Sequence, residues 1–101
     1  MGLLNRKSTT RAQKVEKDIA IINRLGLHAR PAAMFVRIAS RYRAEIWVSK
    51  EGEEVNGKSI MGLMMLGAAK GDRVVIHVTG IRAEDALKKL AALVEERFGE
   101  D

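Results

Sequence analysis

The alternation of apolar and polar positions divides most of the chain into short strands and helices. Segments that are rich in β-branched residues or alternate with period two are typical of strands, whereas apolar residues spaced three and four apart indicate helices. The predicted strands cover residues 18–23, 44–50, about 53–58 and 73–79, and the predicted helices cover residues 29–41, 59–69 and 83–98. This order of short elements predicts an α+β fold, a two-layer sandwich with helices packed on one face of a small sheet.

Two of these segments have the clearest patterns. In the strand 44–50, Ile46 and Val48 fall on the same face. The last helix repeats its apolar residues at spacings of three and four, with Ala83, Ala86, Leu87, Leu90, Val94 and Phe98 on one side. Acidic residues in its first turn complement the positive end of the helix dipole. These periodic segments define the predicted architecture most firmly.

The composition is that of one globular domain. The 101 residues are 47% hydrophobic and 31% charged, which is typical of a globular protein. No run of 18 apolar residues occurs, so a transmembrane helix is excluded. The absence of cysteine excludes disulfides and thiolate metal sites, and two histidines alone cannot form a structural zinc site. We therefore expect a cytoplasmic protein with no metal, no cofactor and no insertion into a membrane.

The positive charge is concentrated at the start of the sequence. The formal net charge is +5, and residues 1–17 hold five basic residues against one acidic residue. We predict that residues 1–17 are a basic, disordered extension and that residues 18–101 form the domain. Because the domain is nearly neutral, nucleic acid is not the expected partner, and Arg37, Arg41 and Arg43 are interpreted as positive charge for acidic protein surfaces. Nucleic-acid binding through the extension and these arginines is the alternative.

A sharp turn and a helix start meet at His28. Gly26 allows the turn, and the helix begins just after His28, with Pro31 tolerated in its first turn. The first N–H groups of a helix and its dipole favour an anion, and Arg30 adds a guanidinium suited to phosphate oxygens. The same field favours a neutral, nucleophilic imidazole. The pattern fits a histidine that accepts and returns a phosphoryl group, although a residue that merely caps the helix has the same spacing. No carboxylate partner for His28 is evident nearby in the sequence.

The helix 59–69 has a capping residue and an extensive apolar surface. Ser59 is the expected N-cap, with an incomplete capping box because position 62 is not Glu or Gln. At 100° per residue, its apolar residues cover every side of the helix: Ile60, Met61, Leu63, Met64, Met65 and Leu66. Because a two-layer protein buries only one side, we expect an exposed, adaptable surface for partner proteins. The alternative is a helix tucked edge-on with most of these residues in the core.

Two separate motifs resemble those of HPr, the family of histidine-containing phosphocarriers of the bacterial phosphoenolpyruvate-dependent phosphotransferase system. Residues 26–32 read GLHARPA, like the family's active-site signature, and residues 56–67 read NGKSIMGLMMLG, like its regulatory serine motif. The resemblance covers about residues 18–98. It implies an open-faced β-sandwich, in which a four-stranded antiparallel sheet carries three helices on one face in the order βαββαβα.

The resemblance implies a role for each residue around His28. His28 corresponds to the phosphorylated histidine, whose Nδ1 takes a phosphoryl group from phospho-enzyme I and passes it to an enzyme IIA protein or domain. Arg30 corresponds to the arginine that stabilises the phosphate, and the backbone N–H groups of Ala29 and Arg30 lie where the family's helix start binds it. By this resemblance the protein is a monomeric carrier in bacterial sugar transport and carbon catabolite regulation, and not an enzyme.

The second motif implies regulation and docking. Ser59 corresponds to the serine that HPr kinase/phosphorylase phosphorylates with ATP. Ile60, Met61 and Met64, with Arg37 from the preceding helix, are expected to contact enzyme I and enzyme IIA. Two alternatives stay open: the nitrogen-related branch of the same family, and a signalling protein that binds a transcription regulator through Ser59 and the Met-rich helix.

Overall fold

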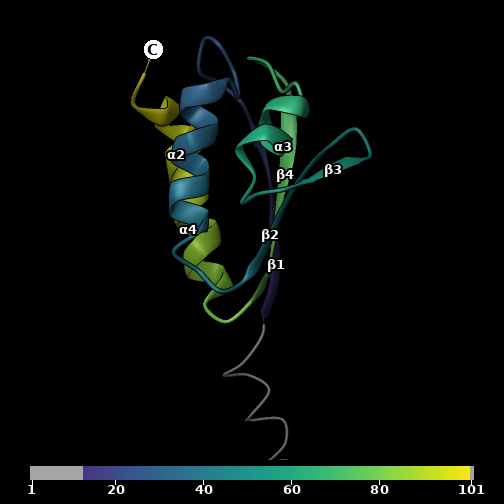
Figure 1. The fold of residues 1–101 in the computed structure, drawn as a ribbon, viewed down its shortest axis with the longest axis vertical. Coiled ribbons are helices and arrows are strands. Elements are labelled where there is room, and N and C mark those ends of the chain that lie inside the picture. Colours follow the sequence, from purple (N-terminus) through teal and green to yellow (C-terminus); the bar gives the residue numbers. More distant parts are fainter. Residues whose placement is uncertain (1–12, 101) are drawn as a thin grey trace, which may run out of the picture.

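The computed structural model describes residues 13–100 of the chain. Its elements run in the order β1 (Gln13–Ala20), α2 (Ala29–Ala39), β2 (Glu45–Lys50), β3 (Glu53–Asn56), α3 (Ile60–Met65), β4 (Arg73–Gly80), α4 (Ala83–Glu95) and a short 3₁₀ helix, η1 (Arg97–Gly99) (Figure 1). The order of strands and α-helices is the predicted one. Within residues 13–100, no helix is both long and apolar enough to cross a membrane.

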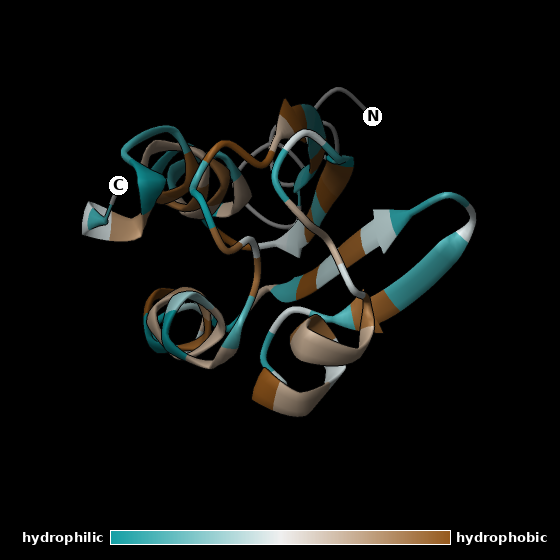
Figure 2. Cartoon of the chain, turned by 90° about the horizontal axis from the view of Figure 1, so that it is seen from above, coloured by the Kyte–Doolittle hydropathy of each residue, from teal (hydrophilic) through white to brown (hydrophobic). Residues whose placement is uncertain are grey.

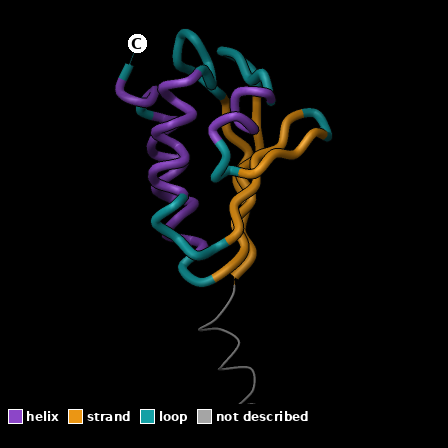
Figure 3. The backbone as a smooth tube through the Cα atoms, viewed as in Figure 1, coloured by secondary structure: helices purple, strands orange, loops and turns teal. Residues whose placement is uncertain are grey.

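All neighbouring strands of the sheet are antiparallel. The strands lie in the order β1–β4–β2–β3, so β4 pairs Val78 with Val15 on one side and with Ile46 on the other. The helices lie on one side of this sheet (Figures 1 and 3), where α4 contacts β1 and β4 and also packs against α2. The predicted α+β sandwich, with a four-stranded antiparallel sheet and three α-helices on one face, is therefore confirmed.

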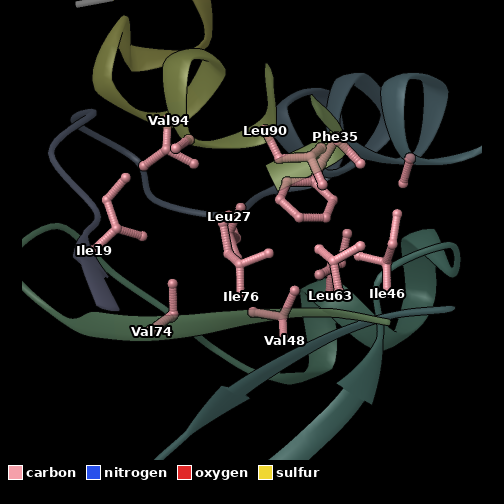
Figure 4. Packing of buried hydrophobic residues seen from close by; sticks show 14 of the residues in the cluster. Ile19, Leu27, Phe35, Ile46, Val48, Leu63, Val74, Ile76, Leu90 and Val94 are labelled. Carbon is pink, nitrogen blue, oxygen red and sulfur yellow. The ribbon is translucent and has the colours of Figure 1, made fainter. Parts of the chain in front are cut away.

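The hydrophobic core fills the space between the sheet and the helices. Alternate residues of β2 and β4 point into it, as Val48 and Ile76 do, and Phe35, Leu90 and Val94 enter it from the helices (Figure 4). Figure 2 shows the same periodicity as hydrophobic and hydrophilic bands that alternate along the strands. Each element therefore buries one face against the other layer, which fixes the ends of the helices relative to the sheet.

The opposite face of the sheet carries the second histidine. His77 and Trp47 are half-buried and face each other in the register of β4 and β2. Nδ1 of His77 lies 3.1 Å from Oε1 of Glu16, and its Nε2 lies 3.0 Å from Oγ of Ser49. These side chains belong to the solvent-facing layer, on the other side of the sheet from the helices.

The predicted strand 18–23 is wrong at both ends, because β1 runs from Gln13 to Ala20. The pairing with β4 begins at Gln13 opposite Gly80. The apolar signal of this strand is weak, because Lys17 occupies an inward position of the edge strand and reaches Glu95 of α4, with Nζ 4.0 Å from Oε2. Residues 13–17 of the predicted extension therefore belong to the sheet, and residues 1–12 lie outside the described residues.

The predicted helices 59–69 and 83–98 are too long, because left-handed backbone follows each helix. Gly67 after α3 has a φ of 69°, and Arg97 and Phe98 after α4 have φ values of 58° and 54°. Phe98 nevertheless has only 1% of its surface exposed. The predicted apolar position is thus buried as expected, but it is reached by a change of chain direction and not by a continuous helix.

Candidate functional site

The turn before α2 requires glycine at position 26. Gly26 has a φ of 69°, in the left-handed region that favours glycine. A Cβ at this position would lie 2.4 Å from the carbonyl oxygen of Ala68 and 2.8 Å from Cα of Ala69. The amide of Leu27 donates to the same Ala68 oxygen at 2.9 Å. This close approach fixes the chain just before His28 against the segment that follows α3.

His28 is the N-cap residue of α2, as predicted. Its backbone is extended, with φ −83° and ψ −170°, and its carbonyl oxygen accepts the first helical hydrogen bond from the amide of Ala32 at 3.0 Å. The imidazole makes no capping hydrogen bond, and its side chain is 34% exposed. Within the described part of the chain, Nδ1 makes no hydrogen bond, so this nitrogen is open to a reaction partner.

The first turn of α2 presents groups that bind an anion. The backbone N–H groups of Ala29 and Arg30 donate to no other described residue, and Pro31 has no N–H group to satisfy. The first turn itself contains no acidic residue, and the helix dipole adds to the positive potential at this end. The Arg30 side chain is exposed beside it. The predicted group of His28, Ala29 and Arg30 therefore lies at one helix end, where it could hold phosphoryl oxygens.

A carboxylate does lie beside His28, contrary to the sequence analysis. Oε1 of Glu100 is 3.2 Å from Nε2 of His28, and the same oxygen accepts a hydrogen bond from Nδ2 of Asn23 at 2.9 Å. These two hydrogen bonds, that of Asn23 first, lower the pKa of Glu100 below its usual value. No spacing rule connects residues 72 positions apart, and the only hint in the sequence was the buried position of Phe98 just before this segment.

Ser59 caps α3, as predicted. Its Oγ accepts a hydrogen bond from the backbone N–H of Gly62 at 2.9 Å. The preceding Lys58 donates from Nζ to the carbonyl oxygen of Tyr42 at 2.6 Å, which ties the start of α3 to the end of the α2–β2 connection. The hydroxyl is half-buried, at the border of the exposed side of α3.

The exposed side of α3 forms an apolar surface, which we call the Met-rich patch. It consists of Ile60, Met61, Met64 and Met65, which are 43%, 70%, 45% and 74% exposed and border a shallow depression of about 460 Å³. The other side of α3 is anchored in the core by Leu63 and Leu66. The predicted exposure of this helix is therefore confirmed, and the alternative of a helix buried edge-on is wrong.

Arg37 is exposed on α2, and Met65 joins the exposed surface although it was absent from the predicted docking residues. The helices α2 and α3 pack against each other. Arg37 follows Arg30 by seven positions, so the two guanidinium groups start from the same side of α2.

Among residues 13–100, no cluster of three or more His, Asp or Glu side chains could hold a metal ion.

Comparisons with known proteins point to one family. The family model described as the PTS HPr component phosphorylation site matches residues 15–96. Phosphocarrier protein HPr of Neisseria meningitidis is 46% identical over 86 residues, which cover 85% of this chain and 97% of that protein. The HPr-like protein Crh of Bacillus subtilis is 43% identical over 82 residues, covering 81% and 96%. The crystal structure of HPr-C-His from Thermoanaerobacter tengcongensis matches with a TM-score of 0.83 at 48% identity, covering 86% of this chain and 98% of that one.

Proposed function

The chain belongs to the HPr family of phosphotransferase-system phosphocarriers, and we propose that His28 is the residue that carries the phosphoryl group. The relatives named phosphocarrier protein HPr are carriers, so the chain is a phosphocarrier and not an enzyme. The observation that best supports the choice of His28 is its place at the start of α2. There Nδ1 of His28 and the N–H groups of Ala29 and Arg30 have no hydrogen-bond partner among the described residues.

In the proposed relay, phospho-enzyme I is the donor and an enzyme IIA protein or domain is the acceptor. The Nδ1 lone pair of His28 forms a bond to phosphorus while the donor's bond to phosphorus breaks, and that electron pair stays on the donor. Arg30 and the two first-turn N–H groups offset the charge of the phosphoryl oxygens. Transfer to enzyme IIA repeats the same displacement, with Nδ1 now recovering its electron pair.

Direct phosphorylation of the purified protein tests the proposal. The protein is incubated with phosphoenolpyruvate and enzyme I and followed by ³¹P NMR. We expect one acid-labile phosphate on Nδ1 of a histidine, formed only when phosphoenolpyruvate and enzyme I are both present. No transfer from an enzyme I that phosphorylates another HPr would overturn the carrier role. The signalling alternative, with a transcription regulator bound at Ser59 and α3, would then be favoured.

We also propose that the Met-rich patch, with Arg37, is the docking surface for enzyme I and enzyme IIA. Met61→Glu is expected to raise the KM for phosphorylation by enzyme I about tenfold, because a charge placed in an apolar contact must be desolvated. Stability should change by less than about 0.5 kcal/mol, because Met61 is largely exposed. Steady-state kinetics and thermal unfolding measure both effects.

Ile81→Glu is the matched control for this docking prediction. Ile81 is 55% exposed, follows β4 and lies outside the Met-rich patch. Its substitution should leave the KM unchanged. Equal effects of the two substitutions would show that the patch has no special part in docking.

We further propose that HPr kinase/phosphorylase phosphorylates Ser59 and that the modification hinders enzyme I. A phosphate adds nearly two negative charges next to Ile60, at the border of the Met-rich patch. Ser59→Asp is expected to slow enzyme I-dependent phosphorylation roughly tenfold by placing a charge at this interface. The initial rate of phosphate incorporation measures the effect.

Ser59→Asn provides the control, because asparagine caps a helix as well as aspartate but carries no charge. Its phosphorylation rate and Tm should both match those of the unmodified protein. If Ser59→Asn were slowed as much as Ser59→Asp, the effect would come from the altered cap and not from charge. Incorporation of phosphate from ATP by the kinase, lost in both variants, tests the modification itself.

A further inference from the structure

Glu100 closes one side of the His28 imidazole and leaves the other side open. We propose that Glu100 is a positioning residue, whose carboxylate holds the proton of His28 on Nε2 and so keeps the lone pair on Nδ1 for the phosphoryl group. This inference rests on the proposed role of His28. It assigns a function to a residue outside both sequence motifs.

The position of the proton follows from the contact between the two side chains. An ionised carboxylate can only accept hydrogen bonds, so the 3.2 Å approach of Oε1 to Nε2 requires Nε2 to donate. A neutral imidazole that donates from Nε2 has its lone pair on Nδ1. The atom left free is therefore the one that the proposed relay uses.

The carboxylate is itself held in place by a buried amide. Asn23 is fully buried, and its Nδ2 donates both to the carbonyl oxygen of Gly26 at 2.8 Å and to Oε1 of Glu100 at 2.9 Å. Rotation of the amide by 180° would place Oδ1 against these two acceptors, so its orientation is fixed. In the described structure Oδ1 of Asn23 has no hydrogen-bond partner. A buried acceptor without a partner opposes folding, as expected where an amide is retained to orient Glu100.

The charged side chains that act on Glu100 are those of His28 and Arg30. The hydrogen bonds from Asn23 and His28 and the nearby guanidinium of Arg30 lower the pKa of Glu100, which favours its ionised form. Phe98, anchored in the core two residues earlier, holds the backbone of this segment beside the start of α2. The contact between Glu100 and His28 is thus held in two ways: Asn23 binds the Glu100 carboxylate, and Phe98 anchors the Glu100 backbone.

The same contact assists the transfer step without moving a proton. When the Nδ1 lone pair bonds to phosphorus and the donor's bond breaks, His28 keeps its Nε2 proton and the ring becomes cationic. The Glu100 carboxylate offsets that positive charge. When the phosphoryl group leaves for the next acceptor, the electron pair of the breaking bond returns to Nδ1, and the ring is again neutral with its proton on Nε2.

Glu100→Gln tests the inference, since it removes the charge but keeps the size of the side chain. In the unphosphorylated, ¹⁵N-histidine-labelled protein, NMR should show a dominant Nε2–H tautomer of neutral His28 that loses population in the variant. The rate of phosphorylation by enzyme I should fall about tenfold, the scale of one hydrogen bond to a charged group. Glu100→Asp should recover part of the Nε2–H tautomer population and part of the phosphorylation rate. Glu96 is an exposed glutamate outside this network, and Glu96→Gln should change neither quantity.

The two measurements separate the inference from the proposed function. The tautomer is measured without any partner, and the rate is measured with enzyme I. Equal tautomer populations and equal rates in Glu100→Gln and the unmodified protein would overturn the role of Glu100 while the carrier role stands. An unmodified protein that takes no phosphoryl group would instead overturn the proposed function, and the inference with it.

Discussion

His28→Ala is expected to lower enzyme I-dependent phosphorylation by about a thousandfold or more, the scale seen when a nucleophile is removed. Alanine offers no lone pair to phosphorus, and the described structure holds no second histidine near the start of α2. The fold should be retained, because the His28 side chain makes no capping hydrogen bond. Its part-buried contact with Glu100 contributes no more than about 1 kcal/mol to stability.

His77→Ala is the control for this result. Both nitrogens of His77 are within hydrogen-bond distance of neighbours, Nδ1 of Glu16 and Nε2 of Ser49, and the residue lies on the other face of the sheet. Phosphorylation of this variant should match that of the unmodified protein. An acid-labile phosphate that persists in His28→Ala and disappears in His77→Ala would reverse the assignment of the two histidines.

Phe98→Ala is expected to destabilise the protein by about 3–5 kcal/mol, the usual cost of removing a large buried aromatic side chain. The ring is 1% exposed and belongs to the core cluster. The total free energy of unfolding of a domain of this size is only about 5–15 kcal/mol, so the substitution removes a large fraction of its stability. The Tm should fall by about 15 °C or more, which differential scanning calorimetry measures.

The same substitution should act on the site, because Phe98 anchors the segment that carries Glu100. In the population that remains folded, the Nε2–H tautomer of His28 should decline as it does in Glu100→Gln. Phe98→Leu keeps an apolar side chain at this position and should cost less than about 1.5 kcal/mol, with the tautomer preserved. A Phe98→Ala protein with an unchanged Tm would show that η1 contributes nothing to the core.

Local patterns in the sequence predicted the parts of the fold that depend on neighbouring residues. The period-two alternation of β2 and the amphipathic spacing of α4 follow directly from which face each element buries. The N-cap positions of His28 and Ser59 follow from where an apolar helical segment begins. The exposure of α3 could be inferred because its apolar residues surround the whole helix, and a two-layer fold buries only one side.

Tertiary contacts determined what the sequence did not reveal. Asn23 looks like the polar end of a strand, yet the structure buries it and uses its amide to orient Glu100. Glu100 reaches His28 only because left-handed backbone at Arg97 and Phe98 turns the chain after α4. The start of β1 was missed for a related reason: its pairing with β4 is visible in the sheet register but not in the polar pattern of an edge strand.

The close approach of Gly26 to the Ala68 backbone fixes the turn before His28 against the segment after α3 through main-chain atoms. The turn before His28 and the segment after α3 are joined by backbone hydrogen bonds, from Leu27 to Ala68 and between Ile21, Gly71 and Asp72. None of these bonds involves an outward-facing side chain of α3. We therefore expect that all four side chains of the Met-rich patch can be replaced together to change which partner protein is bound, without altering the surroundings of His28.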